Sequence, residues 1–308
     1  MIKIQDLRKN FGSLRAVDGL SFEVGPGEVL GFLGPNGAGK STTMKMLTGF
    51  LAPTSGSISV LGIDVVTSPL EAQRQTGYLP EGAPAWGDMT VLAFLKFIGE
   101  VRGFRGRELA SRVDSVVQQV ELQAVLQQRI ETLSKGFRRR VGLAQAMIHD
   151  PQVLIMDEPT DGLDPNQKHQ VRQLIKDFSK DKIVIVSTHI LEEVHAVCTR
   201  AMIIAAGQLV ADGTPDELAA LSDYHRSVRV KLAENCEAKS RFEAIPEVSR
   251  VLVDASGLEF TILPVQGQRV FKPVNRLIYE NNWPVTEFQV EKGRLDDVFR
   301  KVTVEAKQ

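Results

Sequence analysis

The sequence predicts an α/β domain over residues 1–222 with a helical subdomain at about 88–150, then a small α+β domain over residues 223–308. Three observations support this fold class. Apolar runs of strand length stand at residues 28–33, 153–156 and 183–186. Such runs are typical of a parallel sheet covered on both faces. Between 88 and 150 helical periodicity replaces the strand patterns, and beyond residue 222 strands and helices alternate again.

The first sixty residues predict an antiparallel sheet and then a buried strand that leads into a glycine-rich loop. Alternating apolar and polar side chains mark three strands, at residues 2–4, 20–24 and 57–61. Strands with one exposed face show this alternation. The run at 28–33 is apolar nearly throughout, and a helix is expected from Ser41 to Phe50. The order is therefore strand, loop, helix.

The later strands of the α/β domain end in polar residues. The run at 153–156 ends at Asp157 and Glu158, and the run at 183–186 is followed by Ser187, Thr188 and His189. A helix near 166–179 separates the two runs, as in a parallel sheet. Ligands in such sheets bind beyond the carboxyl ends of the strands. These polar residues are therefore expected near one ligand.

The last 86 residues have a pattern of their own. They predict strand 227–232, helix 236–243, strand 248–253, strand 258–263, helix 268–281, strand 285–290 and helix 295–303. The order βαββαβ matches a small ferredoxin-like fold, with one helix added. The segment contains no evident catalytic constellation, so we expect a docking or dimerisation unit there.

Composition narrows the classes of function. The net charge is −1, so no overall basic field points to nucleic acid. The two cysteines, Cys198 and Cys236, have no metal-ligand spacing and are expected to be free thiols. No apolar run approaches the roughly 20 residues of a spanning helix. A role at a membrane would then come through a partner.

The glycine-rich loop fits the pattern G-x-x-x-x-G-K-[ST] and is called the P-loop below. It comprises Gly34, Pro35, Asn36, Gly37, Ala38, Gly39, Lys40, Ser41 and Thr42. Glycines let backbone N–H groups approach phosphate oxygens, and a following helix adds the positive end of its dipole. Lys40 is expected on the β- and γ-phosphates, and Ser41 on Mg²⁺.

The polar strand ends supply candidate catalytic groups. Asp157 is placed to bind Mg²⁺ directly or through water. Glu158 follows it and can polarise a water near the γ-phosphate. His189 lies at the next strand end, where we expect a γ-phosphate contact. All three predictions depend on a nucleotide held by the P-loop.

A second candidate anion site lies at Leu133–Phe137, called the signature segment below, which is followed by Arg138, Arg139 and Arg140. Ser134 is a good N-cap for the following helix, and a helix N-terminus attracts phosphate. The three arginines fit an anion site and a solvated basic surface equally well, and the sequence leaves both readings open.

Taken together, these motifs resemble the nucleotide-binding subunits of ABC transporters over roughly residues 1–220. The P-loop, the strand ending at Asp157–Glu158 and the Thr188–His189 switch follow in the family's order. The signature segment is similar to LSGGQ, and Asp161–Asp164 is similar to the D-loop. Phe11 stands where the family places an aromatic on adenine, and Val17 where an apolar adenine contact is usual.

The resemblance implies ATP and Mg²⁺ as cofactors and a head-to-tail dimer with each ATP between one P-loop and the partner's signature segment. Ser134 and Gly136 would contact the γ-phosphate of the partner's nucleotide, and Asp164 would join the nucleotide contacts. Glu81 replaces the family's Q-loop glutamine, so Ser41, Glu81 and Asp157 are the expected Mg²⁺ ligands. Lys135 and Phe137 also depart from LSGGQ.

These variants, and a terminal Gly293–Phe299 motif, resemble an exporter subgroup with an extra C-terminal domain. We expect an ATPase subunit on the inner face of the cell membrane, driving a separate permease. Trp86 and Phe94 are candidate permease contacts, although Phe94 also fits a core position. A soluble ABC ATPase acting on nucleic acid or ribosomes is one alternative. A regulatory module without turnover is another, but Glu158 and His189 argue against it.

Overall fold

The computed structural model describes residues 1–82, 85–234 and 236–305. It divides into two compact units, Met1–Asp212 and Gly213–Glu305, each with its own hydrophobic core. The second unit begins at Gly213, before the sequence-based boundary at 222, because the short helix α8 (Pro215–Ala219) packs against α11 (Leu295–Glu305). None of the helices among the described residues has both the length and the apolar character needed to span a bilayer.

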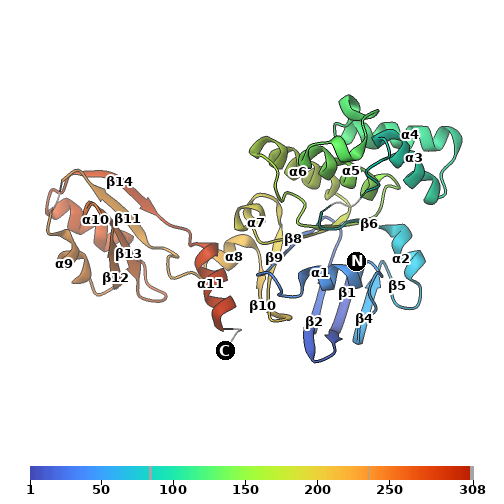
Figure 1. Cartoon of the computed structure of the whole chain (residues 1–308). Helices are drawn as coiled ribbons and strands as arrows, with labels where there is room; N and C mark the ends of the chain where they lie inside the picture. The colour runs from blue at the N-terminus through green and yellow to red at the C-terminus, as the bar shows by residue number, and fades with distance from the viewer. Residues whose placement is uncertain (83–84, 235, 306–308) are drawn as a thin grey trace. The chain divides into compact units, whose positions relative to one another are not determined.

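A six-stranded sheet is the centre of the first unit, in the order β10-β9-β3-β8-β7-β6 (Figure 1). The strands are β3 (Val29–Leu33), β6 (Thr76–Leu79), β7 (Val153–Asp157), β8 (Ile183–Thr188), β9 (Arg200–Ala205) and β10 (Gln208–Gly213). The pairs that link β9, β3, β8, β7 and β6 are all parallel. Their carboxyl ends therefore share one edge, where polar residues follow β7 and β8.

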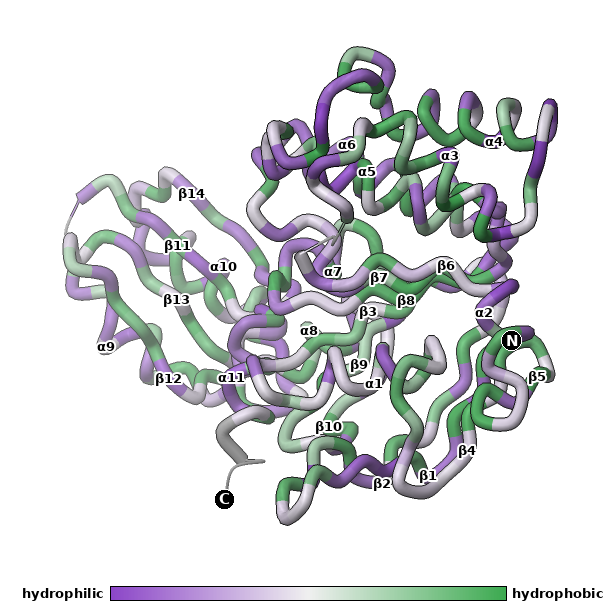
Figure 2. Tube along the Cα trace, turned by 45° about the vertical axis from the view of Figure 1, so that its right-hand side comes forward, coloured by the Kyte–Doolittle hydropathy of each residue, from purple (hydrophilic) through white to green (hydrophobic). Residues whose placement is uncertain are grey.

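Both faces of this sheet are covered, which explains the apolar runs in the sequence. Along β7, Val153 and Ile155 belong to one core and Leu154 and Met156 to the other. In Figure 2, β7 and β8 are drawn mostly in the green of hydrophobic residues. Each β7 side chain is thus buried on one face or the other, as the uninterrupted pattern predicts.

A four-stranded antiparallel sheet, in the order β2-β1-β4-β5, covers one core together with helix α1 (Lys40–Leu47). Its strands are β1 (Ile2–Phe11), β2 (Leu14–Val24), β4 (Ser55–Val60) and β5 (Ile63–Asp64). β1 and β2 are longer than the alternation indicates. Asp6 has a φ of 46° where the register shifts, so the two-residue period breaks there.

Helix α1 was expected to continue to Phe50, and this prediction is wrong. The helix ends at Leu47, with Gly49 next to the cap at a φ of 72°. A glycine in the left-handed region is a common helix stop, because other residues are strained there. The side chain of Phe50 is exposed and touches the ring of Tyr78.

The other face of the central sheet is covered by helices, and those between 88 and 150 form the predicted helical subdomain (Figure 1). Besides α1, the helices of the first unit are α2 (Pro69–Gln75), α3 (Val91–Val101), α4 (Gly106–Gln119), α5 (Lys135–Met147), α6 (Pro165–Phe178) and α7 (Leu191–Val197), with 3₁₀ turns at Gln123–Val125 and Ile130–Thr132. Between residues 88 and 150, the described structure contains helices and turns, as the periodicity predicts.

The second unit contains the predicted order βαββαβ. Its elements are β11 (Val228–Leu232), α9 (Ala238–Glu243), β12 (Val248–Val253), β13 (Glu259–Pro264), α10 (Phe271–Glu280) and β14 (Val285–Val290). The sheet order is β12-β13-β11-β14 and every pair is antiparallel. Residues of both α9 and α10 share one core with the sheet, including Phe242 and Val274. This is the ferredoxin-like element order.

Candidate active site

A cleft of about 500 Å³ lies beside the P-loop at the carboxyl edge of the central sheet. Its walls come from segments far apart in the sequence. They are Phe11, Leu14 and Ala16 of the β1–β2 hairpin, residues 36–42, Glu81, Glu158, Asp161 and His189. The structure thus brings most of the predicted P-loop residues, both predicted catalytic residues and the predicted adenine-stacking ring to one place.

The P-loop holds its shape through backbone features that only glycine supplies. Gly39 has a φ of 102°, and a Cβ there would collide with the carbonyl oxygen of Ala16. Among the described residues, no side chain caps the N-terminus of α1. Its first N–H groups are therefore available to an anion, and the helix dipole favours one.

Lys40 lies at this helix N-terminus with only 7% of its surface exposed. Its Nζ donates to the carbonyl oxygens of Gly34 at 2.7 Å and Pro35 at 3.3 Å. Burial lowers the pKa of Lys40, and the carboxylates of Glu158, Asp157 and Glu81 act in the opposite direction. The ammonium is thus held at the base of the cleft, where the phosphates of a nucleotide would need a positive charge.

Glu158 and His189 face each other across the ends of β7 and β8. Nδ1 of His189 lies 2.8 Å from Oε2 of Glu158. Glu158 has a φ of 52°, which is rare outside glycine, and its N–H donates to the carbonyl oxygen of Ser187 at 3.1 Å. The bend directs the residue after β7 over the P-loop. This geometry gives a carboxylate and an imidazole on one side of the cleft, as predicted.

The expected Mg²⁺ ligands lie at two depths. Ser41 and Glu81 line the cleft, whereas Asp157 is buried and accepts a hydrogen bond from the Ser187 hydroxyl. No group of three His, Cys, Asp or Glu side chains in the described ranges could hold a metal alone. One hydroxyl and one or two carboxylates fit Mg²⁺ that is shared with phosphate oxygens and water.

Four predicted nucleotide contacts outside the P-loop do not line the cleft. Val17 was expected at adenine, but its side chain is fully buried in the core under the P-loop, and Ala16 lines the cleft instead. Ser134, Gly136 and Asp164 do not line the cleft either. Ser134 caps α5 by accepting from the N–H of Phe137 at 3.3 Å. Asp164 likewise caps α6. A single chain does not bring the signature segment to its own P-loop cleft.

The three arginines after the signature segment have three different environments. Arg138 is exposed, Arg140 pairs with Glu121, and Arg139 is buried against backbone carbonyls. Neither reading of the run, anion site or solvated surface, describes Arg139. Ser187 was expected near the ligand as a polar strand-end residue, but its hydrogen bond to Asp157 on the neighbouring strand was not predicted. Only the spacing of Arg139 on the apolar face of α5 could have indicated burial.

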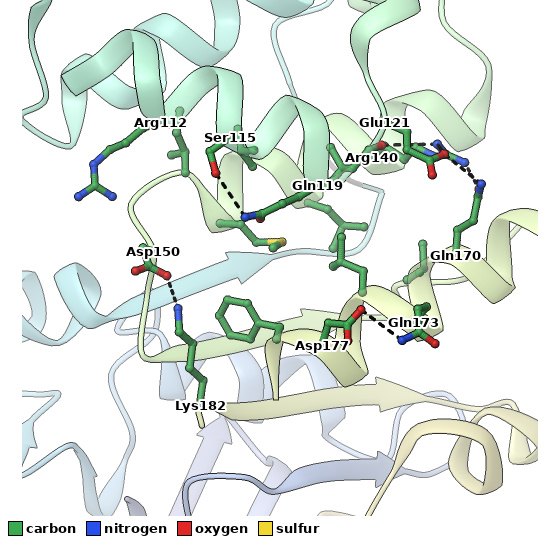
Figure 3. A pocket seen from close by; sticks show the side chains of 18 of the residues that line it. Arg112, Ser115, Gln119, Glu121, Arg140, Asp150, Gln170, Gln173, Asp177 and Lys182 are labelled. Carbon is green, nitrogen blue, oxygen red and sulfur yellow. Dashed lines mark hydrogen bonds and ion pairs between the residues drawn. The ribbon is translucent and has the colours of Figure 1, made fainter. Parts of the chain in front are cut away.

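A larger cavity of about 810 Å³ lies between α4, α5 and α6 (Figure 3). Its polar side chains bond to one another: Arg140 to Glu121 and Gln170, Lys182 to Asp150, and Gln119 to Ser115. Apolar residues such as Val116, Leu143 and Leu174 form the rest. Four of its charged groups, Arg140, Glu121, Lys182 and Asp150, are already paired within the protein, so the cleft at the P-loop is the better candidate for a phosphate-bearing ligand.

Residues 17–161 match the protein-family model described as ABC transporter. The chain is 38% identical over 223 residues to the probable multidrug ABC transporter ATP-binding protein YbhF of Escherichia coli, covering 72% of this chain and 38% of that protein. It is 36% identical over 219 residues to the Nod factor export ATP-binding protein I of Cupriavidus metallidurans, covering 71% and 72%.

A third relative matches along nearly the whole chain. The uncharacterized ABC transporter ATP-binding protein YxlF of Bacillus subtilis is 33% identical over 306 residues, covering 98% of this chain and 99% of that protein. Among solved structures, the ATP binding subunit of an ABC transporter superimposes with a TM-score of 0.66 at 28% identity, covering 72% of this chain and 92% of that one. The likeness to YxlF includes the second unit.

Proposed function

Because the chain belongs to the ABC transporter ATP-binding proteins and carries their ATPase domain, we propose that it hydrolyses ATP to drive export through a separate membrane permease. The observation that carries this proposal is the cleft in which Lys40, Glu158 and His189 meet. A phosphate-binding cation, a carboxylate and an imidazole in one site suit attack of water on a γ-phosphate.

In the proposed reaction, the P-loop N–H groups and Lys40 hold the β- and γ-phosphates. Glu158 orients a water and accepts its proton as the oxygen attacks the γ-phosphorus. The bond from the γ-phosphorus to the bridging oxygen breaks, and ADP and phosphate leave. His189, 2.8 Å from Glu158, is placed to contact both that carboxylate and a γ-phosphate oxygen. Mg²⁺ held by Ser41 and Glu81 would neutralise phosphate charge.

The proposed dimer accounts for the signature segment. Ser134 and Gly136 lie at the N-terminus of α5, outside the cleft of their own chain. Two helix N-termini, α1 and α5, could bind one polyphosphate if they came from two copies in head-to-tail order. ATP would then hold the two copies together, and hydrolysis would release them.

Export and the permease contact rest on the relatives and on one exposed surface. The Nod factor protein and YbhF are named for export and for multidrug transport. Trp86 is 54% exposed and its ring lies 5.1 Å from that of Phe97, which is also exposed. Phe94 is fully buried, so it serves the core beneath Trp86. We propose Trp86 and Phe97 as permease contacts, which would hold the protein at the cytoplasmic membrane face.

The test is Glu158→Gln, which removes the proton acceptor but keeps the size of the side chain. General-base catalysis contributes roughly 100- to 10,000-fold, so steady-state hydrolysis should fall by that factor. ATP binding should persist, and the variant should sediment as a dimer with ATP. Glu192→Gln, at an exposed position on α7, should behave as wild type. Undiminished hydrolysis by Glu158→Gln, or a monomer at saturating ATP, would contradict the proposal.

A further inference from the structure

Arg139 is a buried arginine next to the candidate active site. It lies in the second turn of α5, two residues beyond the signature segment, and is only 5% exposed. Buried arginines are rare unless hydrogen bonds satisfy the guanidinium. Its neighbours Arg138 and Arg140 are not buried. The environment of Arg139 is therefore specific to this position of the helix.

The guanidinium of Arg139 donates to four backbone carbonyl oxygens. Nη2 reaches the carbonyl of Asp157 at 2.6 Å and also that of Glu158, and Nε reaches Pro159 at 3.0 Å. Nη1 reaches the carbonyl of Pro80 at 3.3 Å. These carbonyls lie at the carboxyl ends of two neighbouring strands, β6 and β7. One planar side chain thus fixes the strand end that precedes Glu81 relative to the strand end that carries Glu158.

Arg139 also completes the support of the strained residue. The N–H of Glu158 is held by Ser187 of β8, and its carbonyl is held by Arg139. A left-handed φ at a glutamate persists only where surrounding contacts enforce it. With both of its backbone polar groups bonded, Glu158 keeps its side chain over the cleft and 2.8 Å from His189.

The positive charge of Arg139 is also favourable at this position, because carboxylates surround it. Burial lowers its pKa, whereas the carboxylates of Asp161, Asp157, Glu158 and Glu81 raise it. An arginine remains protonated in proteins, because its ordinary pKa lies far above neutral pH. A fixed positive charge thus lies under a cluster of acidic groups that would otherwise repel one another and the phosphates.

We infer that Arg139 is a positioning residue for ATP hydrolysis: it holds the backbone of Glu158 and of the segment at Glu81 in register and ties them to the helix that begins with the signature segment. The inference rests on the proposed function. Since the N-terminus of α5 is proposed to bind the partner's nucleotide, a shift of α5 on closure would reach Glu158 of the same chain through Arg139. Each nucleotide would then influence hydrolysis of the other.

The experiment compares Arg139→Lys and Arg139→Gln with Arg107→Gln, a control at an exposed arginine of α4 that does not line the cleft. Lysine keeps the charge but lacks the fork that reaches four carbonyls. A misplaced catalytic group costs up to about 100-fold, so both Arg139 variants should lose about 10- to 100-fold in kcat. Their Kd for ATP–Mg²⁺ by calorimetry should stay within about twofold of wild type, as should all constants of Arg107→Gln.

A second measurement separates positioning from general stability. In the Glu158→Gln background, Arg139→Lys should still form the ATP-dependent dimer, because only the step after closure is impaired. Wild-type kcat in both Arg139 variants would overturn the inference, as would a loss of ATP binding that parallels the loss of kcat. Failure of both variants to fold would overturn it too. If the wild-type protein lacks ATPase activity, the proposed function fails first, whatever Arg139 does.

Discussion

The first unit contains two helix N-termini that resemble anion sites, and they are built in different ways. At α1 the preceding residue is Gly39, no described side chain caps the helix, and Lys40 is buried against the loop. At α5 the N-cap Ser134 bonds to the helix backbone, and Lys135 is exposed and pairs with Asp161 at 3.0 Å. Only the first N-terminus opens into a cleft with Glu158 and His189.

The difference shows which half of the proposed site one chain contains. The part of the site at the N-terminus of α1 is formed by one chain. Lys40, the first N–H groups of α1 and the carboxylates of Glu81 and Glu158 converge on the same cleft. The α5 end has a helix dipole and small residues, but Ser134 and Gly136 do not line the cleft at the P-loop. A Cβ at Gly136 would collide with the Gln167 side chain, so this end is closely packed against α6. We therefore expect changes at α1 to affect binding by each chain, and changes at α5 to act through a second copy.

The largest expected effect is at Lys40. Charge-assisted hydrogen bonds contribute about 1.5–3 kcal/mol each, so removing contacts to two phosphates should weaken ATP–Mg²⁺ binding by roughly 100-fold or more. Calorimetry on Lys40→Ala measures this. Lys45→Ala changes an exposed lysine on the same helix and should leave the Kd unchanged. An unchanged Kd for Lys40→Ala would contradict the assignment of the P-loop as the ATP-binding site. It would also remove the proposed difference between the N-termini of α1 and α5.

The next largest effect is on the pH dependence of folding stability, through a histidine near the C-terminus of α5. His149, just after α5, is partly buried and has its Nε2 3.2 Å from the carbonyl oxygen of Thr76. Burial lowers its pKa to about 4, with Arg102 and Arg112 acting in the same direction and Asp150 and the Thr76 carbonyl against them. The folded protein therefore carries a neutral His149 at pH 7, as does the unfolded chain.

As the pH falls from about 6.5 to about 4, the unfolded chain binds a proton at His149 and the folded chain does not. The contribution of His149 to the free energy of unfolding is therefore fully present above pH 6.5. It is lost as the pH falls to about 4, and the loss is on the order of 3 kcal/mol. Urea unfolding of wild type and His149→Gln at pH 7.5 and pH 5 measures it. His149→Gln should lose less free energy of unfolding between pH 7.5 and pH 5 than the wild type does. Equal pH slopes would mean that α5 is not anchored by a neutral histidine.

The sequence predicted most of the central sheet because its strands are buried on both faces. Residues 153–156 lie in β7 and 183–186 in β8. Predictions failed where backbone conformation overrides pattern, as at Asp6 in β1 and at Gly49 beyond α1. The four-residue strand β6 gives too short a signal for periodicity. In the second unit, β12 and β14 have the predicted ends, since polar turns bound each of them.

The residues of the predicted site also differ in how well the sequence locates them. The P-loop, Glu158 and His189 are readable because a contiguous motif and adjacent strand ends locate them. Val17 is buried and does not line the cleft, whereas Ala16 does, because successive side chains of a strand point to opposite sides. The spacing of Arg139 on α5 could have indicated its burial, but its role could not be identified, because its four partners are backbone carbonyls, which leave no mark in the sequence.

The smallest expected effect is at Lys135, the residue that most distinguishes α5 from the LSGGQ pattern. A cation in the first helical turn opposes the helix dipole, at a cost of about 0.3–1 kcal/mol. The exposed pair with Asp161 stabilises the fold by less than about 1 kcal/mol. These contributions nearly cancel, so Lys135→Ala should hardly change the midpoint of thermal unfolding. A residue so close to neutral for the fold is best explained by the charge that it would bring to a partner's phosphate.

Lys135→Ala should therefore raise the KM for ATP about two- to fivefold, which is the range of one exposed charge contact. The increase should shrink at high salt, because exposed charges are screened. It should also persist in an Asp161→Asn background, since the proposed target is phosphate rather than the aspartate. Lys176→Ala, an exposed change on α6, is the control. If Asp161→Asn abolished the effect, Lys135 would act only within its own chain, and α5 would lose the feature that makes its N-terminus the complement of α1.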